Sequence, residues 1–277
     1  MKFGYCVSMA AQDPAGIGYE RIPILQKLGF DYVEMPLAQI MSQDEQAFRA
    51  GPLAALERCG LPCLCMNNFF PGGCRLTGPD ADHESALSYA QAAFKRASRL
   101  GVRTVIFGSS GARNKPCGTP AFQGIDQLAS LLHRLAPLAE THGITIAIEH
   151  LNKQESNLIN RFSDACALAR WVNHPHIGTL LDTFHMNLSG ETYDCVLEGG
   201  TLLRHVHIAR TLGRSLPCPE DEEDYSILFQ TLGKINYDGC ISLEANTRKD
   251  FESEAETALH HLRTTFHNAE VANESRV

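Results

Sequence analysis

Short apolar runs alternate with longer amphipathic stretches from one end of the chain to the other. The longer stretches, such as 84–100 and 127–141, carry apolar or small residues at helical spacing. The short runs have the length of buried strands, and they lie at 3–9, 31–35, 62–67, 104–108, 145–150, 178–182, 205–209 and 240–244. Strands and helices that alternate in this way are typical of βα units around a parallel sheet.

The number of these units predicts the architecture. Eight strands with their helices fit a single (β/α)₈ TIM barrel that takes up residues 1–277 as one domain. Glycines follow several helices just before the next strand, as short connections require, at Gly29, Gly60, Gly101, Gly143 and Gly239. The alternative is an open doubly wound sheet, but that fold would usually carry a glycine-rich phosphate loop after an early strand, and the sequence has none there.

Polar side chains stand at the carboxyl ends of the predicted strands, where active sites of such barrels are built. Glu34 ends the second strand and Asn67 the third, and the last four strands end in Glu149, Asp182, His207 and Glu244. Three converging carboxylates would repel one another, whereas a bound divalent cation holds them ionised. These last four residues therefore predict a site for one divalent metal ion. Their donors suit Mn²⁺, which we favour, and also Co²⁺, Mg²⁺ or Zn²⁺.

Two further histidines accompany these predicted ligands. His205 and His207 are two residues apart on one predicted strand, so both can face the same side and either could be the ligand. His150 follows Glu149 directly, and we expect its ring to point away from the metal and to pack outward.

Composition and charge narrow the classes of function. Lys and Arg number 24 against 32 Asp and Glu, a net charge of -8, so no basic surface for nucleic acid is indicated. No run approaches the roughly 18 apolar residues of a membrane span. The N-terminal segment lacks a signal-peptide pattern, so we expect a cytoplasmic protein without a membrane partner. The ten cysteines are scattered through a large chain, which predicts reduced and mostly buried thiols.

Four segments, IAIEHLNKQESN, LLDTFHMN, HVHIARTLGRSLP and YDGCISLEAN, resemble the xylose-isomerase-like sugar isomerases and epimerases, particularly the ketose 3-epimerases. The segments NNFFPGG and FGSSGAR resemble the third and fourth strand loops of the same family. The resemblance implies a metal-dependent epimerase of a free ketose. The second histidine of the family's H-x-H pattern is the metal ligand, which implies His207 and leaves His205 in a supporting role. Family members often form dimers or tetramers, and the sequence leaves the assembly of this chain open.

The resemblance also implies individual roles. Glu149 and Glu244 would bind the metal and act as an acid and base pair on opposite faces of C3, through a metal-stabilised enediolate. We expect the small-molecule sugar to be bound by Glu155 at its end, by His185 through an oxygen, by Arg214 through the enediolate oxygens, and by Asn67.

The chain departs from the family pattern in several places. His150 stands where ketose 3-epimerases usually have proline, and the spacing from His207 to Arg214 is one residue longer. An acidic run at 216–224 either forms a solvated loop or, near the mouth of the barrel, favours free sugars over sugar phosphates. The loop 108–113 either faces the substrate or is a plain turn, and Phe69 and Phe70 line either the pocket or a subunit interface.

Other functions remain open at this stage. The same enolising site would serve a lyase or dehydratase acting on a keto-sugar or inosose, including enzymes that cleave C-glycosides. A non-catalytic sugar-binding subunit could keep the fold without turnover. A repair nuclease on this fold would want further histidine ligands and a basic groove, and the sequence shows neither.

Overall fold

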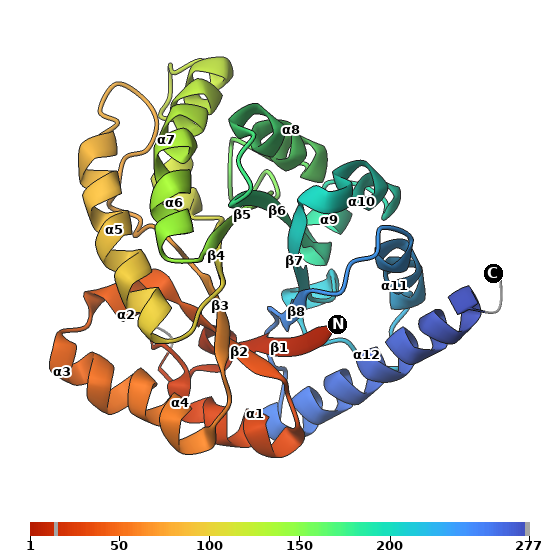
Figure 1. Cartoon of the computed structure of the whole chain (residues 1–277). Coiled ribbons are helices and arrows are strands. Elements are labelled where there is room, and N and C mark those ends of the chain that lie inside the picture. Colours follow the sequence, from red (N-terminus) through yellow and green to blue (C-terminus); the bar gives the residue numbers. More distant parts are fainter. Residues whose placement is uncertain (14–15, 275–277) are drawn as a thin grey trace.

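Eight parallel strands close a barrel in sequence order within the described residues (Figure 1). The computed structural model describes residues 1–13 and 16–274, so residues 14–15 and 275–277 of the predicted domain lie outside the described part. The strands are β1 (Lys2–Cys6), β2 (Tyr32–Pro36), β3 (Cys63–Asn67), β4 (Thr104–Phe107), β5 (Thr145–Glu149), β6 (Ile177–Asp182), β7 (Leu203–Ile208) and β8 (Cys240–Leu243). The predicted (β/α)₈ barrel is confirmed, and β1 is shorter than expected because Val7–Ala10 forms a 3₁₀ turn.

Helices form an outer ring around the strands (Figure 1). They are α1 (Ile22–Leu28), α2 (Leu37–Ser42), α3 (Glu45–Phe48), α4 (Ala54–Cys59), α5 (His83–Arg99), α6 (Ser110–Arg113), α7 (Ala121–Thr141), α8 (Phe162–Val172), α9 (Thr183–Leu188), α10 (Asp194–Gly199), α11 (Tyr225–Lys234) and α12 (Phe251–Glu274). Asp82 accepts a hydrogen bond from the Ser85 amide and so caps α5. Gly101 then leaves that helix at φ 84°, a conformation that glycine adopts without steric cost.

Alternating strand positions face two different layers. One cluster fills the barrel interior, and it comprises Tyr32, Cys65, Ile106, Ala147 and Leu180. Strand positions of the opposite parity, among them Val33 and Val105, belong to the much larger cluster that includes the helices. This division follows from the two-residue period of a strand inside a ring of helices.

The strand register brings the predicted ligands to one height. Asp182 of β6 pairs with His207 of β7, and His207 pairs with Ser242 of β8. The Glu244 amide donates to the Ile208 carbonyl at 3.1 Å, which continues the ladder one step beyond β8. The polar strand ends therefore meet on the same rim of the barrel.

Two further expectations concern the chain as a whole. All ten cysteines lie in the described part of the chain and are free thiols. The expectation that most are buried is wrong, because five are partly exposed and Cys117 is exposed, which leaves Cys6, Cys63, Cys65 and Cys166 buried. Within residues 1–13 and 16–274, none of the helices combines the length and the apolar character that crossing a membrane requires.

Candidate metal and active site

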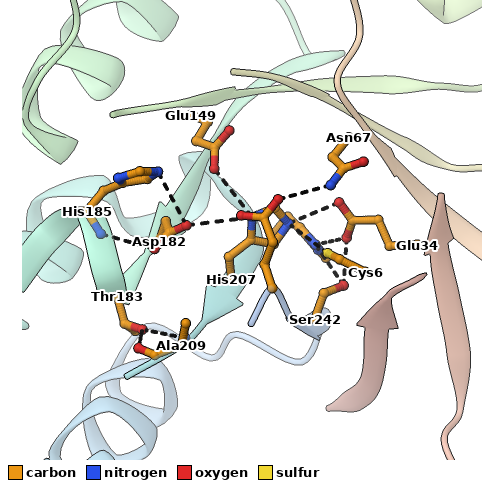
Figure 2. A network of polar contacts seen from close by, with 12 residues as sticks. Cys6, Glu34, Asn67, Glu149, Asp182, Thr183, His185, His207, Ala209 and Ser242 are labelled. Carbon is orange, nitrogen blue, oxygen red and sulfur yellow. Dashed lines mark hydrogen bonds and ion pairs between the residues drawn. The ribbon is translucent and has the colours of Figure 1, made fainter. Parts of the chain in front are cut away.

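The four predicted metal ligands converge on one point. Glu149 ends β5, Asp182 ends β6, His207 lies near the end of β7, and Glu244 follows β8 directly. His207 Nδ1 lies 3.4 Å from Glu149 Oε1, 3.9 Å from Asp182 Oδ2 and 3.2 Å from Glu244 Oε2 (Figure 2). All four side chains are buried, and their ligand atoms lie within 4.8 Å of one another. The geometry is thus that of a group that could hold one metal ion.

Two of these buried atoms lack a hydrogen-bond partner, although they lie close to each other. Glu149 Oε1 and His207 Nδ1 make no hydrogen bond within the described residues. Buried polar atoms are normally paired, so two unpaired atoms that face the same point fit a group that would bind both. Three carboxylates and one imidazole nitrogen match the donors that divalent cations such as Mn²⁺ accept.

The two glutamates differ in their affinity for a proton. Burial raises the pKa of Glu149, and the nearby charge of Glu244 acts in the same direction. Burial also opposes ionisation of Glu244, but His207 and Arg214 outweigh it and hold the pKa of Glu244 well below its usual range. Environments that separate two neighbouring carboxyl groups in this way are typical of acid and base pairs.

Glu34, which sequence reasoning left without a role, contacts His207, the predicted histidine ligand. Its carboxylate accepts from His207 Nε2 at 3.0 Å, from His205 Nε2 at 2.8 Å and from the Ser242 hydroxyl at 2.6 Å (Figure 2). A proton on Nε2 of His207 leaves Nδ1 free to bind a cation, which is the usual arrangement of a carboxylate behind a ligating histidine. His205 therefore lies behind the ligand, where the sequence had placed it.

A cavity of about 530 Å³ opens beside the four ligands. Its walls come from the loops after β2 to β8, and they comprise Ala38, Gln39, Ser42, Asn68, Phe70, Pro71, Gly72, Gly108, Ser109, Ser110, Gly111, Glu149, Leu151, Glu155, His185, Arg214 and Glu244. Three predicted substrate residues, Glu155, His185 and Arg214, line it. Asn67 does not line the cavity, so the expectation that it binds the substrate there is not met, and its side-chain amide donates instead to Glu244 Oε1 at 3.0 Å (Figure 2).

Arg214 occupies the boundary between the ligands and the cavity. It donates to Glu244 Oε2, lies 3.5 Å from Asp182 Oδ2, and stacks 4.9 Å above the Phe184 ring. It adopts φ 46°, a strained backbone conformation for a residue other than glycine. Its Nη1 also lies 3.7 Å from Glu155 Oε1, so one guanidinium links the metal ligands to the outer carboxylate.

Asn152 joins the other two substrate residues and was missed by sequence reasoning. Its side-chain nitrogen Nδ2 lies 3.0 Å from Glu155 Oε1 and 2.9 Å from His185 Nδ1. His185 Nε2 lies 3.7 Å from Asp182 Oδ2 (Figure 2) and makes no hydrogen bond among the described residues, although the ring is fully buried. One nitrogen of His185 is therefore held in place, and the other is available to a ligand in the cavity.

Two aromatic positions and His150 find different environments. Phe70 lines the cavity, whereas Phe69 is fully buried in the core against Phe94. Both phenylalanines are too buried to form an exposed interface surface. His150 points away from the ligands, as expected, and lies 5.9 Å from the Phe162 ring, where burial lowers its pKa to about 3.

The acidic run is a structural loop, so the expectation that it repels sugar phosphates loses its basis. Asp221 forms a 2.7 Å ion pair with Arg210, Glu223 accepts from the Thr211 amide, and Asp224 caps α11. Among the described cavity-lining residues none comes from this run. Negative charge at the cavity comes instead from Glu149, Glu155 and Glu244.

Gly108 gives the Glu149 carboxylate the space it occupies. A methyl group at this position would overlap Glu149 Oε2. We expect Gly108→Ala to lower kcat about 100-fold at saturating Mn²⁺, because a misplacement of about 1 Å in a reacting group can cost that much. Gly73→Ala is the matched control, since a methyl group there would meet nothing within 4 Å. Full activity of the Gly108 variant would show that Glu149 does not need its present position.

Comparison with known proteins gives a consistent picture. A family model described as a xylose isomerase-like TIM barrel matches residues 22–265. A ketose 3-epimerase from Arthrobacter globiformis is 27% identical over 238 residues, which cover 84% of this chain and 78% of that protein. A 3-dehydro-D-guloside 4-epimerase from Escherichia coli is 24% identical over 250 residues, 85% of this chain and 90% of the relative. The structure of D-psicose 3-epimerase with D-tagatose from Clostridium cellulolyticum H10 superposes with a TM-score of 0.84 at 20% identity, covering 96% of this chain and 99% of that one.

Proposed function

Because the chain belongs to the xylose isomerase-like TIM barrel family and is an enzyme of the sugar isomerase and epimerase class, we propose that it is a divalent-metal-dependent epimerase of a free ketose, acting at C3. The observation that carries this proposal is the pair of buried carboxylates, Glu149 and Glu244, that face one ligand point beside a polar cavity. Glu149 ends β5 and Glu244 follows β8, so the two carboxylates reach the site from different strands, as two-sided proton transfer requires.

Four residues would hold the ion, namely Glu149, Asp182, His207 and Glu244. A divalent cation, when bound, supplies positive charge that polarises the substrate oxygens and stabilises an enediolate. One glutamate removes the proton from C3 next to the C2 carbonyl, and the other delivers a proton to the opposite face. The roles exchange when the reaction runs in reverse. The net result is inversion at C3, with no change of mass.

The other cavity residues would orient the sugar. His185 Nε2 is available to a substrate oxygen, and Arg214 can donate to the oxygens on which negative charge develops. Glu155 can accept from a hydroxyl at the far end of the sugar. Arg214, the arginine among the described cavity-lining residues, already pairs with Glu155, Asp182 and Glu244. Its charge is therefore largely balanced, which favours a neutral sugar over a phosphorylated one.

Product analysis tests this function. We expect the protein with Mn²⁺ to convert at least one of a panel of free ketoses into an epimer of equal mass, and treatment with a chelator to abolish the conversion. A product lighter by one water, formed from a keto-sugar or an inosose, would assign the site to elimination instead. Turnover of a ketose phosphate without turnover of the free sugar would contradict the proposed substrate class.

A further inference from the structure

Arg113 is a fully buried arginine that none of the roles above uses. It ends α6, the short helix after β4, and its side chain turns inward, away from the cavity that the preceding residues line. Its Nε and Nη2 atoms have no hydrogen-bond partner among the described residues. A buried cation without a partner is costly, and an apolar side chain of similar size is often no worse for stability. Its presence beside the site therefore calls for a local explanation.

The guanidinium binds the ends of two strands. Arg113 Nη1 donates to the Phe107 carbonyl at 2.9 Å and to the Glu149 carbonyl at 2.7 Å. The ladder between β4 and β5 ends at the pair of Phe107 and Ile148. Glu149 thus lies one residue beyond the last β4 pairing, and Arg113 donates the hydrogen bond that its carbonyl does not receive from β4. Because the peptide group is planar, a fixed Glu149 carbonyl restrains the position of the Glu149 Cα atom, from which the carboxylate side chain projects.

We propose that Arg113 is a positioning residue, which holds the main chain of Glu149 so that its carboxylate stays on the metal and the substrate carbon. This role rests on the proposed function. The backbone supports it, because Ser109 adopts φ 36° and the Arg113 amide donates to the Ser109 carbonyl at 3.0 Å. This single helical turn brings the chain back over the strand ends. Gly108, at the start of the same loop, provides the space for the carboxylate.

The neighbouring residue offers an internal comparison. Asn114 contacts the loop after β5 at a point six residues beyond Glu149, because its Nδ2 donates to the Glu155 carbonyl at 3.1 Å. Its Oδ1 accepts from the Ser156 hydroxyl at 2.8 Å and from the Asn157 amide at 3.1 Å. Adjacent side chains of one loop therefore hold two different parts of the site. Arg113 holds the main chain of Glu149, and Asn114 holds the main chain of Glu155.

This arrangement predicts that the two neighbouring substitutions have different effects. Arg113→Met should weaken Mn²⁺ binding and lower kcat about 10- to 100-fold, the usual effect of removing a residue that orients a ligand, with little change in KM. Arg113→Lys keeps the charge and one donor, so we expect it to recover part of both losses. Asn114→Ala should raise KM about 3- to 10-fold, the equivalent of a net hydrogen bond, and leave Mn²⁺ affinity unchanged.

Calorimetric Mn²⁺ titration, thermal melting and steady-state kinetics on the same preparations test the proposal. Arg96→Met is the matched control, because Arg96 Nη1 also donates to two main-chain carbonyls, those of Ile40 and Gln43. It should lower Tm without weakening Mn²⁺ binding. If the Arg113 variants lose Tm only, or lose no more Mn²⁺ affinity than the Arg96 control, the positioning role is overturned. The Mn²⁺ titration needs no turnover. A wild-type protein inactive on every ketose would overturn the proposed function, and the titration would still decide whether Arg113 affects Mn²⁺ affinity.

Discussion

Replacing Glu149 or Glu244 by glutamine is expected to lower kcat about 10²- to 10⁴-fold, the usual contribution of a positioned acid or base. Glutamine keeps the shape of the side chain and one oxygen donor, but it neither removes nor delivers a proton at carbon. Each carboxylate is nine-tenths buried or more, at 6% and 8% exposure, so bulk water cannot readily replace it in proton transfer. Steady-state kinetics at saturating Mn²⁺ measure the effect, because both residues are also expected ligands.

The Glu84→Gln variant is the matched control. Glu84 is exposed on α5, where it pairs with Arg134, and its replacement should leave kcat unchanged. The two site variants should also retain a cooperative thermal transition. If either site variant kept more than about a tenth of the wild-type kcat, that glutamate would not be an obligatory proton carrier, since even a weak general acid or base contributes about 10²-fold.

Glu34→Gln should weaken metal binding about 10- to 100-fold although Glu34 is not itself an expected ligand. The Glu34 carboxylate is fully buried and accepts from two histidines and one serine. Burial alone would raise its pKa, but His207 and His205 outweigh burial and hold the pKa of Glu34 below its ordinary value. A glutamine nitrogen cannot accept from either ring, so at least one of these contacts is lost.

The same substitution should lower the free energy of unfolding by about 3–5 kcal/mol, as expected when one partner of a buried charged network is removed. Chemical denaturation and Mn²⁺ titration of one preparation measure both effects. A control at Glu57, an acidic residue outside the site on α4, should change neither quantity when replaced by glutamine. Unchanged Mn²⁺ affinity in Glu34→Gln would mean that the orientation of His207 does not depend on Glu34.

Sequence alone predicted the barrel and grouped the four candidate ligands, because both predictions depend on the order of strands and helices along the chain. The carboxyl ends of the strands of a parallel barrel share one rim. Once the alternation of strands and helices is recognised, the last polar residue of each strand is therefore assigned to that rim. Glu149, Asp182, His207 and Glu244 needed no further information to be grouped.

The supporting residues depend on contacts that the sequence order does not reveal. Glu34 meets His205 across the barrel, from 171 positions away, and the Asn67 amide turns toward Glu244 instead of the cavity. Arg113 was read as part of a loop, because the inward turn of its side chain depends on the strained backbone at Ser109. The acidic run illustrates the opposite error, since its charges are used locally, as in the pair of Asp221 with Arg210.

Hydrogen exchange at C3 of the substrate tests the central claim most directly. The protein would be incubated with Mn²⁺ and a converted ketose in D₂O, and the sugars analysed by NMR and mass spectrometry. We expect the epimer to carry one deuterium at C3. The labelled epimer should form at the rate of wild-type turnover, and its formation should be lost in Glu149→Gln and Glu244→Gln. An epimer that forms without deuterium at C3, or an epimer that still forms at the wild-type rate in either variant, would contradict proton transfer by these two glutamates.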